Sequence, residues 1–542
     1  MSDGELVDYL IVGAGPAGLQ AGYFLDRSGH SYLIVESGTA PGTFFTRFPR
    51  HRTLISINKV HTGWDDPELR LRTDWNSLLS DEGAPLFTGC TPRYFPAADD
   101  LVRYLADFAA THRLRVRYGT RITSIARPGP PAGTGDFVAR AEDGTVFRAR
   151  RLIVATGVTQ PYVPDIEGVE TAERYGDVTV DPADFTGQRV LIIGRGNSGF
   201  ETADNLIETA AVIHLAGPGS LRMAWQTHFV GHLRAVNNNF LDTYQLKSQN
   251  ALLDGKVLSI RRRPDRSYLV AVAFARVDEV VKEIPYDRVI LATGFRFDAS
   301  PFAPECRPQL TINDRFPAQT DAWESVNVPD LYFAGTLTQV RDFKKSTSGF
   351  IHGFRYGVRA LHHILERRYH GVPWPGKELP PTPAAAADAV VERVNRSSAL
   401  WQQFGVLADA LLVGPDGGLR YHEEVPVAHL HRTVADGDFG DVERYFSVTL
   451  EYGADHDRVD PFTVEVTRPA QRDASGLDGR YLHPVVREFT GGARPADPAP
   501  VPEAEHHLTE NLENEWDSEE VHRAPLLRFL RTRLARAGAD HA

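Results

Sequence analysis

The sequence predicts an α/β fold that contains two Rossmann-like domains, one inserted into the other, and ends in an α+β region. Two observations lead to this prediction. First, an apolar strand that leads into glycines spaced G-x-G-x-x-G and then into a helix-like run occurs twice, beginning at residues 9 and 190. Second, a strand ending in Ala-Thr-Gly follows each unit, at residues 155–157 and 292–294. The repeated strand, spacing and helix are more specific than a single glycine motif.

The first unit has the features of a dinucleotide site. Gly13 permits a tight turn, Gly15 lets the backbone approach a pyrophosphate, and Gly18 lets the helix pack against the strand. The N-terminus of that helix favours phosphate, and the next strand ends in Glu36, where a carboxylate accepts a ribose hydroxyl. Other expected contacts, some of them at a later strand end and helix start, are Pro16, Ala17, Ser37, Thr43, Phe44, Phe45, Ala155, Thr156, Gly157, Gly335, Thr336, Gly349 and Phe350.

The second unit, with Gly194, Gly196 and Gly199, has the same spacing but a different end. No acid stands where Glu36 stands in the first unit, and Arg222 follows the next strand. Because a carboxylate repels a 2′-phosphate and an arginine attracts one, we predict that this unit binds NADPH rather than NADH. Arg222 is the expected phosphate contact, although a solvated surface arginine fits the sequence equally. Further expected contacts are Asn197, Ser198, Thr293 and Gly294.

The composition argues against several classes of protein. A net charge of −12 over 542 residues disfavours broad nucleic-acid binding. No apolar run approaches the roughly 18 residues that span a bilayer, and the N-terminus lacks a signal-peptide pattern, so we expect a cytoplasmic protein that is not in the membrane. Cys90 and Cys306 form no C-x-x-C pair, which disfavours a dithiol catalyst, and we predict no metal site.

Two dinucleotide units imply two nucleotides. The simplest assignment is a resident FAD in the first unit and a hydride donor, NADPH, in the second. The reduced flavin then needs an electron acceptor, and the sequence provides neither a dithiol nor ligand spacing for Fe–S or haem. The remaining common acceptor is dioxygen. We therefore predict a monooxygenase that inserts one oxygen atom from O2 into a small-molecule substrate through a flavin C4a-hydroperoxide.

This assignment divides the chain into four segments. Residues 1–160 and 285–372 are expected to form a discontinuous FAD domain, and residues 161–284 the inserted NADPH domain. A Pro-rich stretch at 373–383 marks a boundary, after which residues 384–542 form an α+β domain without a catalytic motif.

Two alternatives to the monooxygenase remain open. One is an NADPH-dependent flavin oxidoreductase that passes electrons to a protein or a quinone. The other is a non-enzymatic flavoprotein that binds partners through its tail. Substrate-dependent NADPH consumption coupled to oxygen uptake distinguishes the three possibilities. The sequence leaves the oligomeric state open.

Several motifs support the monooxygenase by resemblance. Gly194-Arg195-Gly196-Asn197-Ser198-Gly199 resembles the NADPH site of class B flavin monooxygenases, and Tyr94-Phe95-Pro96 resembles the start of the helix after their active-site loop. Ser56-Ile57-Asn58-Lys59 is similar to the loop whose asparagine faces the flavin C4a position. This resemblance implies catalytic roles for Asn58 and Lys59, although asparagine is also a common turn former.

Longer runs resemble a family of endoplasmic-reticulum flavoproteins associated with degradation. They lie at residues 44–52, 74–79, 242–247, 349–355 and 404–409, so the resemblance extends from the first unit into the tail. The chain lacks both a signal peptide and a retention signal, which again favours the cytoplasm.

Two basic stretches lead to a substrate hypothesis: one holds Arg47, Arg50, His51, Arg52 and Lys59, and the other holds Arg341, Lys344 and Lys345. Each stretch adjoins an expected FAD contact, so we expect both to converge on the flavin. Arginine suits bidentate recognition of a carboxylate, which predicts N-oxygenation of a small amine or amino acid, possibly aspartate. Alternatively, these cations are solvated or bind only FAD and NADPH. The expected substrate contacts are Arg47, His51, Asn239, Arg341 and Lys345.

Overall fold

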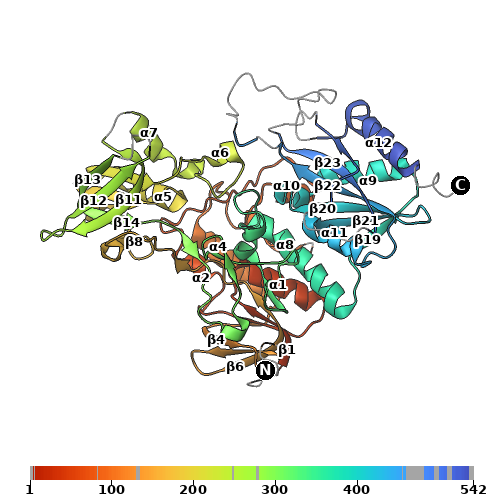
Figure 1. Ribbon diagram of the computed structural model, residues 1–542, viewed down its shortest axis with the longest axis horizontal. Coiled ribbons are helices and arrows are strands. Elements are labelled where there is room, and N and C mark those ends of the chain that lie inside the picture. The colour runs from red at the N-terminus through yellow and green to blue at the C-terminus, as the bar shows by residue number, and fades with distance from the viewer. Residues whose placement is uncertain are drawn as a thin grey trace.

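The computed structural model describes residues 4, 6–81, 83–129, 133, 135–246, 249–275, 280–453, 456–458, 481–492, 500–509 and 515–535. Over these ranges the chain folds into three large sheets with flanking helices, as the α/β prediction requires (Figure 1). No helix within the described ranges is long and apolar enough to cross a membrane.

The first sheet carries the first glycine motif at its carboxyl edge. Strand β1 (Leu6–Val12) lies between β2 (Tyr32–Val35) and β6 (Val146–Val154), and the three are parallel. Val12 is aligned with both Val35 and Val154, so the loops that follow these strands lie side by side. The other elements of this domain are α1 (Pro16–Arg27), α2 (Thr43–Arg47), α3 (Pro67–Leu71), α4 (Ala98–Thr111), β3 (Val116–Arg117), β4 (Ile122–Ala126), β5 (Phe137–Ala141), β16 (Leu310–Thr311), β17 (Phe316–Pro317), β18 (Leu331–Phe333) and α8 (Ile351–Leu365).

The second sheet repeats this arrangement. Strand β9 (Arg189–Ile193) lies between the parallel strands β10 (Val212–Gly217) and β14 (Arg288–Leu291). Since β14 belongs to this sheet, the boundary predicted at residue 284 is wrong. The Ala-Thr-Gly ending after β14 matches the one after β6, and such an ending does not specify which sheet a strand joins. The other elements are β7 (Gln160–Pro161), which pairs with β15 (Phe295–Arg296) where the chain enters and leaves the domain, β8 (Glu173–Arg174), α5 (Asn197–Leu206), α6 (Ala224–Thr227), α7 (Asn239–Gln245), β11 (Ala251–Arg262), β12 (Tyr268–Phe274) and β13 (Val281–Tyr286).

The tail forms a third, antiparallel sheet flanked by helices, as the predicted α+β region requires. Its strand order is β19-β21-β20-β22-β23-β24. Strand β19 (Gly376–Leu379) pairs with β21, so the Pro-rich stretch expected to be a boundary supplies an edge strand, and the domain begins before residue 384. The other elements are α9 (Pro383–Arg396), α10 (Ser398–Gln402), β20 (Leu407–Val413), β21 (Leu419–Pro426), α11 (Val427–Ala435), β22 (Arg444–Glu451), β23 (His483–Thr490), β24 (Ala504–His507) and α12 (Ala524–Leu534).

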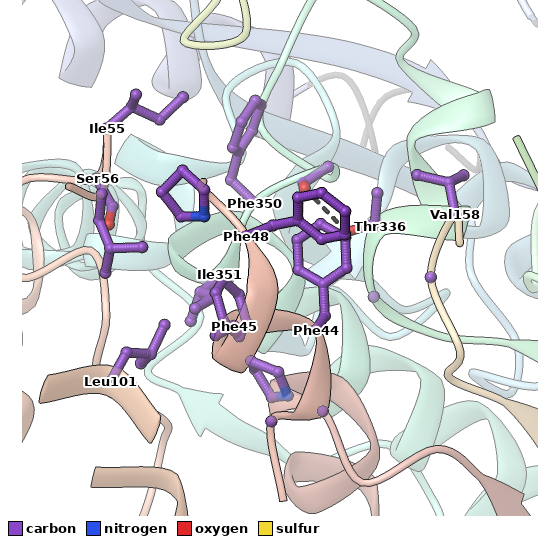
Figure 2. Close-up of a pocket in the computed structure, with 18 of the residues that line it drawn as sticks. Phe44, Phe45, Phe48, Ile55, Ser56, Leu101, Val158, Thr336, Phe350 and Ile351 are labelled. Carbon is purple, nitrogen blue, oxygen red and sulfur yellow. Dashed lines mark hydrogen bonds between the residues drawn. The ribbon is translucent and has the colours of Figure 1, made fainter. Parts of the chain in front are cut away.

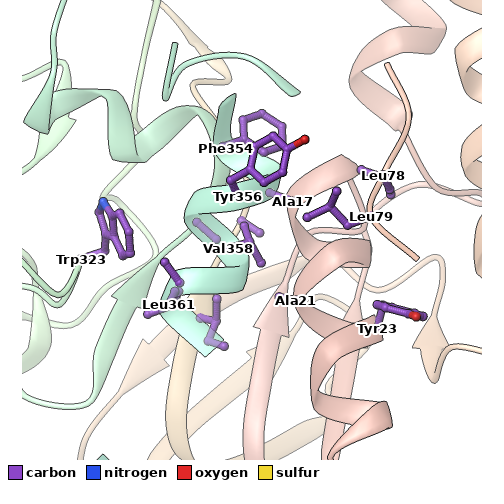
Figure 3. Packing of buried hydrophobic residues seen from close by; sticks show 14 of the residues in the cluster. Ala17, Ala21, Tyr23, Leu78, Leu79, Trp323, Phe354, Tyr356, Val358 and Leu361 are labelled. Atoms are coloured by element: carbon purple, nitrogen blue, oxygen red, sulfur yellow. The ribbon is translucent and has the colours of Figure 1, made fainter. Parts of the chain in front are cut away.

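Helix α8 joins the first domain to the tail. It packs against α1, where the small side chains of Ala17 and Ala21 share a buried cluster with Val358 and Leu361 of α8 (Figure 3). The same cluster includes Leu407 of β20, and α8 also contacts α10 and β21. Helix α8 is therefore held by two domains at once.

Candidate cofactor and active site

The first glycine turn leaves room for a ligand at one position only. A Cβ atom on Gly13 would lie 2.9 Å from the Ala155 carbonyl oxygen, and one on Gly18 would lie 1.9 Å from the Gly13 carbonyl oxygen. These two glycines are thus required by packing. A Cβ atom on Gly15 would meet nothing within 4 Å. Gly15 precedes α1, so the open space there lies at a helix N-terminus, where a pyrophosphate is stabilised.

Glu36 is held at the end of β2 by several donors. Its carboxylate accepts hydrogen bonds from the backbone N–H groups of Ala14 and Gly38, both at 2.8 Å, and from the Thr43 hydroxyl at 3.0 Å. The Ser37 hydroxyl donates to it at 3.2 Å. Glu36 is buried yet lies at the carboxyl edge of the sheet, which is the position of a ribose-binding acid.

A mainly apolar cavity of about 360 Å³ connects the two glycine units (Figure 2). Its wall includes Gly15 on one side and Asn197 of the second unit on the other. The structure therefore brings these predicted residues together around one space: Gly15, Pro16, Ala17, Phe44, Phe45, Ala155, Thr156, Gly157, Asn197, Ser198, Gly335, Thr336, Gly349 and Phe350. Thr293 and Gly294 line a small adjoining cleft with Tyr175 and Ser198.

His352 is a polar group in this apolar wall that the sequence did not reveal. It is fully buried in the second position of α8, and neither ring nitrogen has a hydrogen-bond partner within the described structure. Its ring stacks on Trp75 with centroids 4.2 Å apart. Burial lowers the pKa of His352 well below its ordinary value, with smaller contributions from Arg355 and Arg234. The imidazole is therefore neutral and offers one donor and one acceptor to a ligand.

Glu201 is the second missed residue on the wall. It lies on α5 and is buried, and the Tyr175 hydroxyl donates a hydrogen bond to it. Burial raises the pKa of Glu201 from 4.5 to about 7, so the group exchanges a proton near neutral pH. The sequence signal was weak because Glu201 lies two residues beyond Gly199, outside the glycine motif itself.

These features fit a bound FAD. The open space at Gly15 suits the pyrophosphate, and the fixed carboxylate of Glu36 suits the adenosine ribose. The apolar and aromatic wall suits a flat ring, and the unpartnered His352 leaves a hydrogen-bonding capacity for a ligand with polar edges. An unpartnered buried polar group costs about 1–3 kcal/mol, which a ligand hydrogen bond offsets.

Asn58 does not line this cavity, although its neighbours Ile55 and Ser56 do. Its side chain is buried, and its amide nitrogen donates to the carbonyl oxygens of Thr91 at 2.7 Å and of Arg93 at 3.3 Å. Lys59 is exposed. A role for Asn58 and Lys59 at the flavin stays a prediction that the cavity wall does not support.

The two basic stretches do not converge on the apolar cavity, which corrects the sequence-based expectation. Arg47 pairs with Asp177 at 2.5 Å, and Arg52 pairs with Asp99 at 2.6 Å. Burial and the neighbouring Arg50 lower the pKa of His51 to about 4, and Asn239 is exposed at the start of α7. Proximity to a cofactor segment along the chain does not fix the direction of a side chain.

The second basic stretch instead lines a separate cavity of about 690 Å³. Arg341, Lys344 and Lys345 face it from the first domain, and residues 426–428 and 451–453 face it from the tail. We call this space the basic cavity, although the carboxyl groups of Asp321, Asp342, Glu451 and Asp457 line it as well. Arg222 also borders it, with its side chain 58% exposed and 3.3 Å from Asp457. The structure thus gives Arg222 a carboxylate partner in the tail.

Within the described residues, one cluster has the composition of a metal site, although none was predicted. His30, Glu366 and His370 have potential ligand atoms within 4.8 Å of one another. The two imidazoles stack with centroids 3.9 Å apart and an interplanar angle of 24°, and His370 is also hydrogen-bonded to Tyr9. Nearly parallel stacked rings do not direct their nitrogens to one point, so the cluster is better described as a hydrogen-bonded network.

Comparisons with known proteins agree with this architecture. The family described as Pyridine nucleotide-disulphide oxidoreductase matches residues 10–335. FAD-dependent oxidoreductase domain-containing protein 2 of Mus musculus is 39% identical over 562 residues, covering 96% of this chain and 83% of that protein. The protein of the same name from Danio rerio is 37% identical, covering 96% of this chain and 82% of that protein.

Solved structures share the fold over about two thirds of the chain. A flavin-containing monooxygenase from Stenotrophomonas maltophilia has a TM-score of 0.50 and 21% identity, covering 67% of this chain and 98% of that one. An ornithine N-hydroxylase from Kutzneria sp. 744 has a TM-score of 0.50 and 17% identity, covering 67% of this chain and 100% of that one. At such identities the likeness concerns the fold alone.

Proposed function

Since this chain belongs to the pyridine nucleotide-disulphide oxidoreductase family and is an oxidoreductase that uses FAD and NAD(P)H, we propose that it is an NADPH-dependent monooxygenase of small amines. The observation that carries the proposal is that the two nucleotide units share one apolar cavity. A hydride donor bound at Asn197 and Ser198 and a flavin bound at Gly15 would meet in that space.

The cysteines support dioxygen over a disulphide as the electron acceptor. Both are free, and neither Cys90 nor Cys306 lines the apolar cavity. Cys306 is fully buried, and burial raises the pKa of its thiol to about 11, which suppresses the reactive thiolate. The chain therefore lacks a dithiol that would relay electrons from this cavity.

Besides the flavin, oxygen chemistry needs protection from water, a group that exchanges protons and a group that orients the ligand, and residues of the wall could supply these three. FAD, when bound, supplies hydride acceptance and activation of dioxygen. The partly buried rings of Phe45, Phe48 and Phe350 on the wall would limit the access of water to the space, which would protect reactive species from hydrolysis (Figure 2). Glu201 holds or releases a proton near neutral pH, and neutral His352 orients a ligand by a hydrogen bond.

The polarity of this wall supports an uncharged amine as the substrate. An amine that enters an apolar space is favoured in its neutral form, which is the nucleophilic form. Among the described lining residues none is Lys or Arg, so an uncharged amine fits best. An acidic amino acid such as aspartate is the second candidate, because the basic cavity contains cations for which no carboxylate partner is seen in the described structure, Lys344 and Lys345.

Oxygen and cofactor consumption test the proposal together. The purified FAD-loaded chain is supplied with NADPH and a panel of amines and amino acids, and O2 uptake is measured with product mass under labelled O2. We expect one labelled oxygen per NADPH on the nitrogen of the substrate. NADPH oxidation that depends on a quinone or an electron-carrier protein, without labelled product, would identify a reductase. Absence of any NADPH oxidation would favour a binding protein.

A further inference from the structure

The two nucleotide units can be compared residue by residue because their strands have matching register. Val12 of β1 is aligned with Val35 of β2, and Ile193 of β9 is aligned with Ala216 of β10. In the first unit the Gly13 N–H donates to the Val35 carbonyl at 2.8 Å. In the second, the Gly194 N–H donates to the Ala216 carbonyl at 2.9 Å. The position of Glu36 therefore corresponds to Gly217, and that of Ala14 corresponds to Arg195.

The two units carry different residues at these two corresponding positions, and this difference changes the chemistry of the strand end. In the first unit the acid at position 36 is bonded to the backbone N–H of the small residue Ala14. In the second unit the guanidinium of Arg195 occupies this region and donates to the Gly217 carbonyl at 2.9 Å. A Cβ atom on Gly217 would lie 2.9 Å from Arg195 Nε, so glycine makes room for the arginine.

An acidic side chain does lie at the end of β10, but it comes from the neighbouring strand β11. Asp254 of β11 is aligned with Gly217, and its carboxylate lies 2.5 Å from Arg195 Nη1. The Arg195 side chain is 6% exposed and that of Asp254 is 35% exposed. The second unit therefore has no acid at the end of β10, as the sequence indicates. In the folded chain, however, Asp254 of β11 places a carboxylate at the same strand end.

We propose that Arg195, not Arg222, distinguishes NADPH from NADH by binding the 2′-phosphate, and that Asp254 is a counter-charge that limits this preference. The inference rests on the proposed use of a pyridine nucleotide by the second unit. Arg195 stands where the first unit presents its ribose-binding acid, and a guanidinium binds phosphate through two N–H groups. Asp254 holds the guanidinium in place and repels the phosphate. Arg222, by contrast, is exposed and pairs with Asp457 of the tail.

Direct binding to the FAD-loaded full chain tests the proposal without relying on turnover. Titration calorimetry compares 2′,5′-ADP, which carries the extra phosphate, with 5′-AMP, which lacks it. Loss of a charge-assisted contact in Arg195→Gln should weaken 2′,5′-ADP binding by about tenfold or more and leave 5′-AMP binding nearly unchanged. Asp254→Asn should strengthen 2′,5′-ADP binding, and Arg195→Lys should retain part of the preference.

Two further variants keep the test decisive. Arg222→Gln is the matched control and should preserve the wild-type ratio of the two affinities. Because Arg195→Gln removes the guanidinium that pairs with Asp254, Arg195→Gln/Asp254→Asn removes both charges of this pair, and FAD content together with thermal unfolding verifies folding. The double variant should also lose the preference for the phosphate.

The opposite results would overturn the assignment. An unchanged affinity ratio in Arg195→Gln and in the double variant, or loss of the preference in Arg222→Gln, would remove Arg195 from this role. Stronger binding of 5′-AMP in Asp254→Asn would mean that Asp254 does not act as a counter-charge to the phosphate. Failure of the proposed use of a pyridine nucleotide is distinct, because wild-type protein would then bind neither 2′,5′-ADP nor 5′-AMP and NADPH would not reduce its flavin.

Discussion

The apolar cavity and the basic cavity differ in the charge and the exposure of their lining side chains, yet one short segment lines both. Residues 341, 342 and 344–346 face the basic cavity, whereas residues 349–352 face the apolar one. Between them the chain is tied to the tail, since the Ser346 hydroxyl donates to the Phe404 carbonyl and the Thr347 hydroxyl to that of Gln402. The segment therefore separates the two cavities, and residues that are close in sequence line different cavities.

The comparison shows why charge along the sequence was a poor guide to the substrate. Arg341, Lys344 and Lys345 are exposed in the more open cavity. His352, only seven residues after Lys345, is fully buried and neutral in the other cavity. We therefore expect substitutions in the apolar cavity to alter cofactor binding and pH dependence, and substitutions in the basic cavity to alter at most the selection of charged ligands.

The largest effect should follow from Gly15→Val. A Cβ atom at Gly15 meets no protein atom within 4 Å, so the branched side chain starts in open space and extends into the region predicted for the pyrophosphate. We expect the purified variant to be folded but nearly free of flavin, as measured by absorbance and by circular dichroism. Full FAD occupancy would contradict the assignment of the first unit.

The equivalent glycine of the second unit supplies the control. A Cβ atom on Gly196 likewise meets nothing within 4 Å. Gly196→Val should therefore retain FAD but lose its reduction by NADPH, which separates the two nucleotide sites within one cavity. Flavin loss in this variant would show that the two units are not independent.

A smaller effect, on stability, is expected from Glu201→Gln. In the unfolded chain this carboxyl titrates near 4.5, and in the folded chain near 7, because burial penalises the charge. Its stabilising contribution is therefore complete below pH 4.5 and lost as the pH rises through about 7. The loss amounts to about 3 kcal/mol, and the glutamine variant should not show it.

Chemical denaturation between pH 5 and 8 measures this difference. The wild-type free energy of unfolding should fall relative to that of Glu201→Gln as the pH increases. Glu208→Gln, at an exposed position near the end of the same helix, is the matched control and should follow the wild type. Parallel curves for wild type and Glu201→Gln would show that Glu201 is ionised throughout this range.

Arg341→Ala tests whether the basic cavity takes part in catalysis. If it holds the carboxylate of an acidic amino acid, loss of this cation should raise the KM for aspartate by about tenfold. The KM for an uncharged amine should stay unchanged. Arg307→Ala is a suitable control, because Arg307 is also exposed and donates to a backbone carbonyl but borders neither cavity. An unchanged KM for both substrates would restrict the substrate to the apolar cavity.

The sequence predicted the fold well because its signals are local. The strand, the glycine turn and the helix follow one another directly in the sequence, and Gly18 meets Gly13 only five residues away, as Gly199 meets Gly194 in the second unit. Glu36 was found for the same reason. The boundary near β14 was missed because membership in a sheet depends on pairing between distant strands.

The missed site residues share a different cause. His352 is a candidate site residue because it is buried against Trp75, and Trp75 lies far away in the sequence. The Arg195–Asp254 pair arises because β11 is aligned with β10. Spacing within a motif identifies where a nucleotide binds, whereas the residues that tune its chemistry come from neighbouring elements that only the fold brings together.

The smallest effect is expected for Asn58→Ala, and it concerns stability rather than chemistry. The Asn58 amide nitrogen is bonded to the Thr91 and Arg93 carbonyls, so its removal should lower the free energy of unfolding by about 1 kcal/mol. Because Asn58 does not line the apolar cavity, flavin reduction and the ratio of product to NADPH should stay as in the wild type. Lys59→Ala, at the neighbouring exposed position, should change neither quantity. Native stability in Asn58→Ala combined with excess hydrogen peroxide would instead place Asn58 at the flavin, and the apolar cavity would then extend behind the loop at residues 55–59.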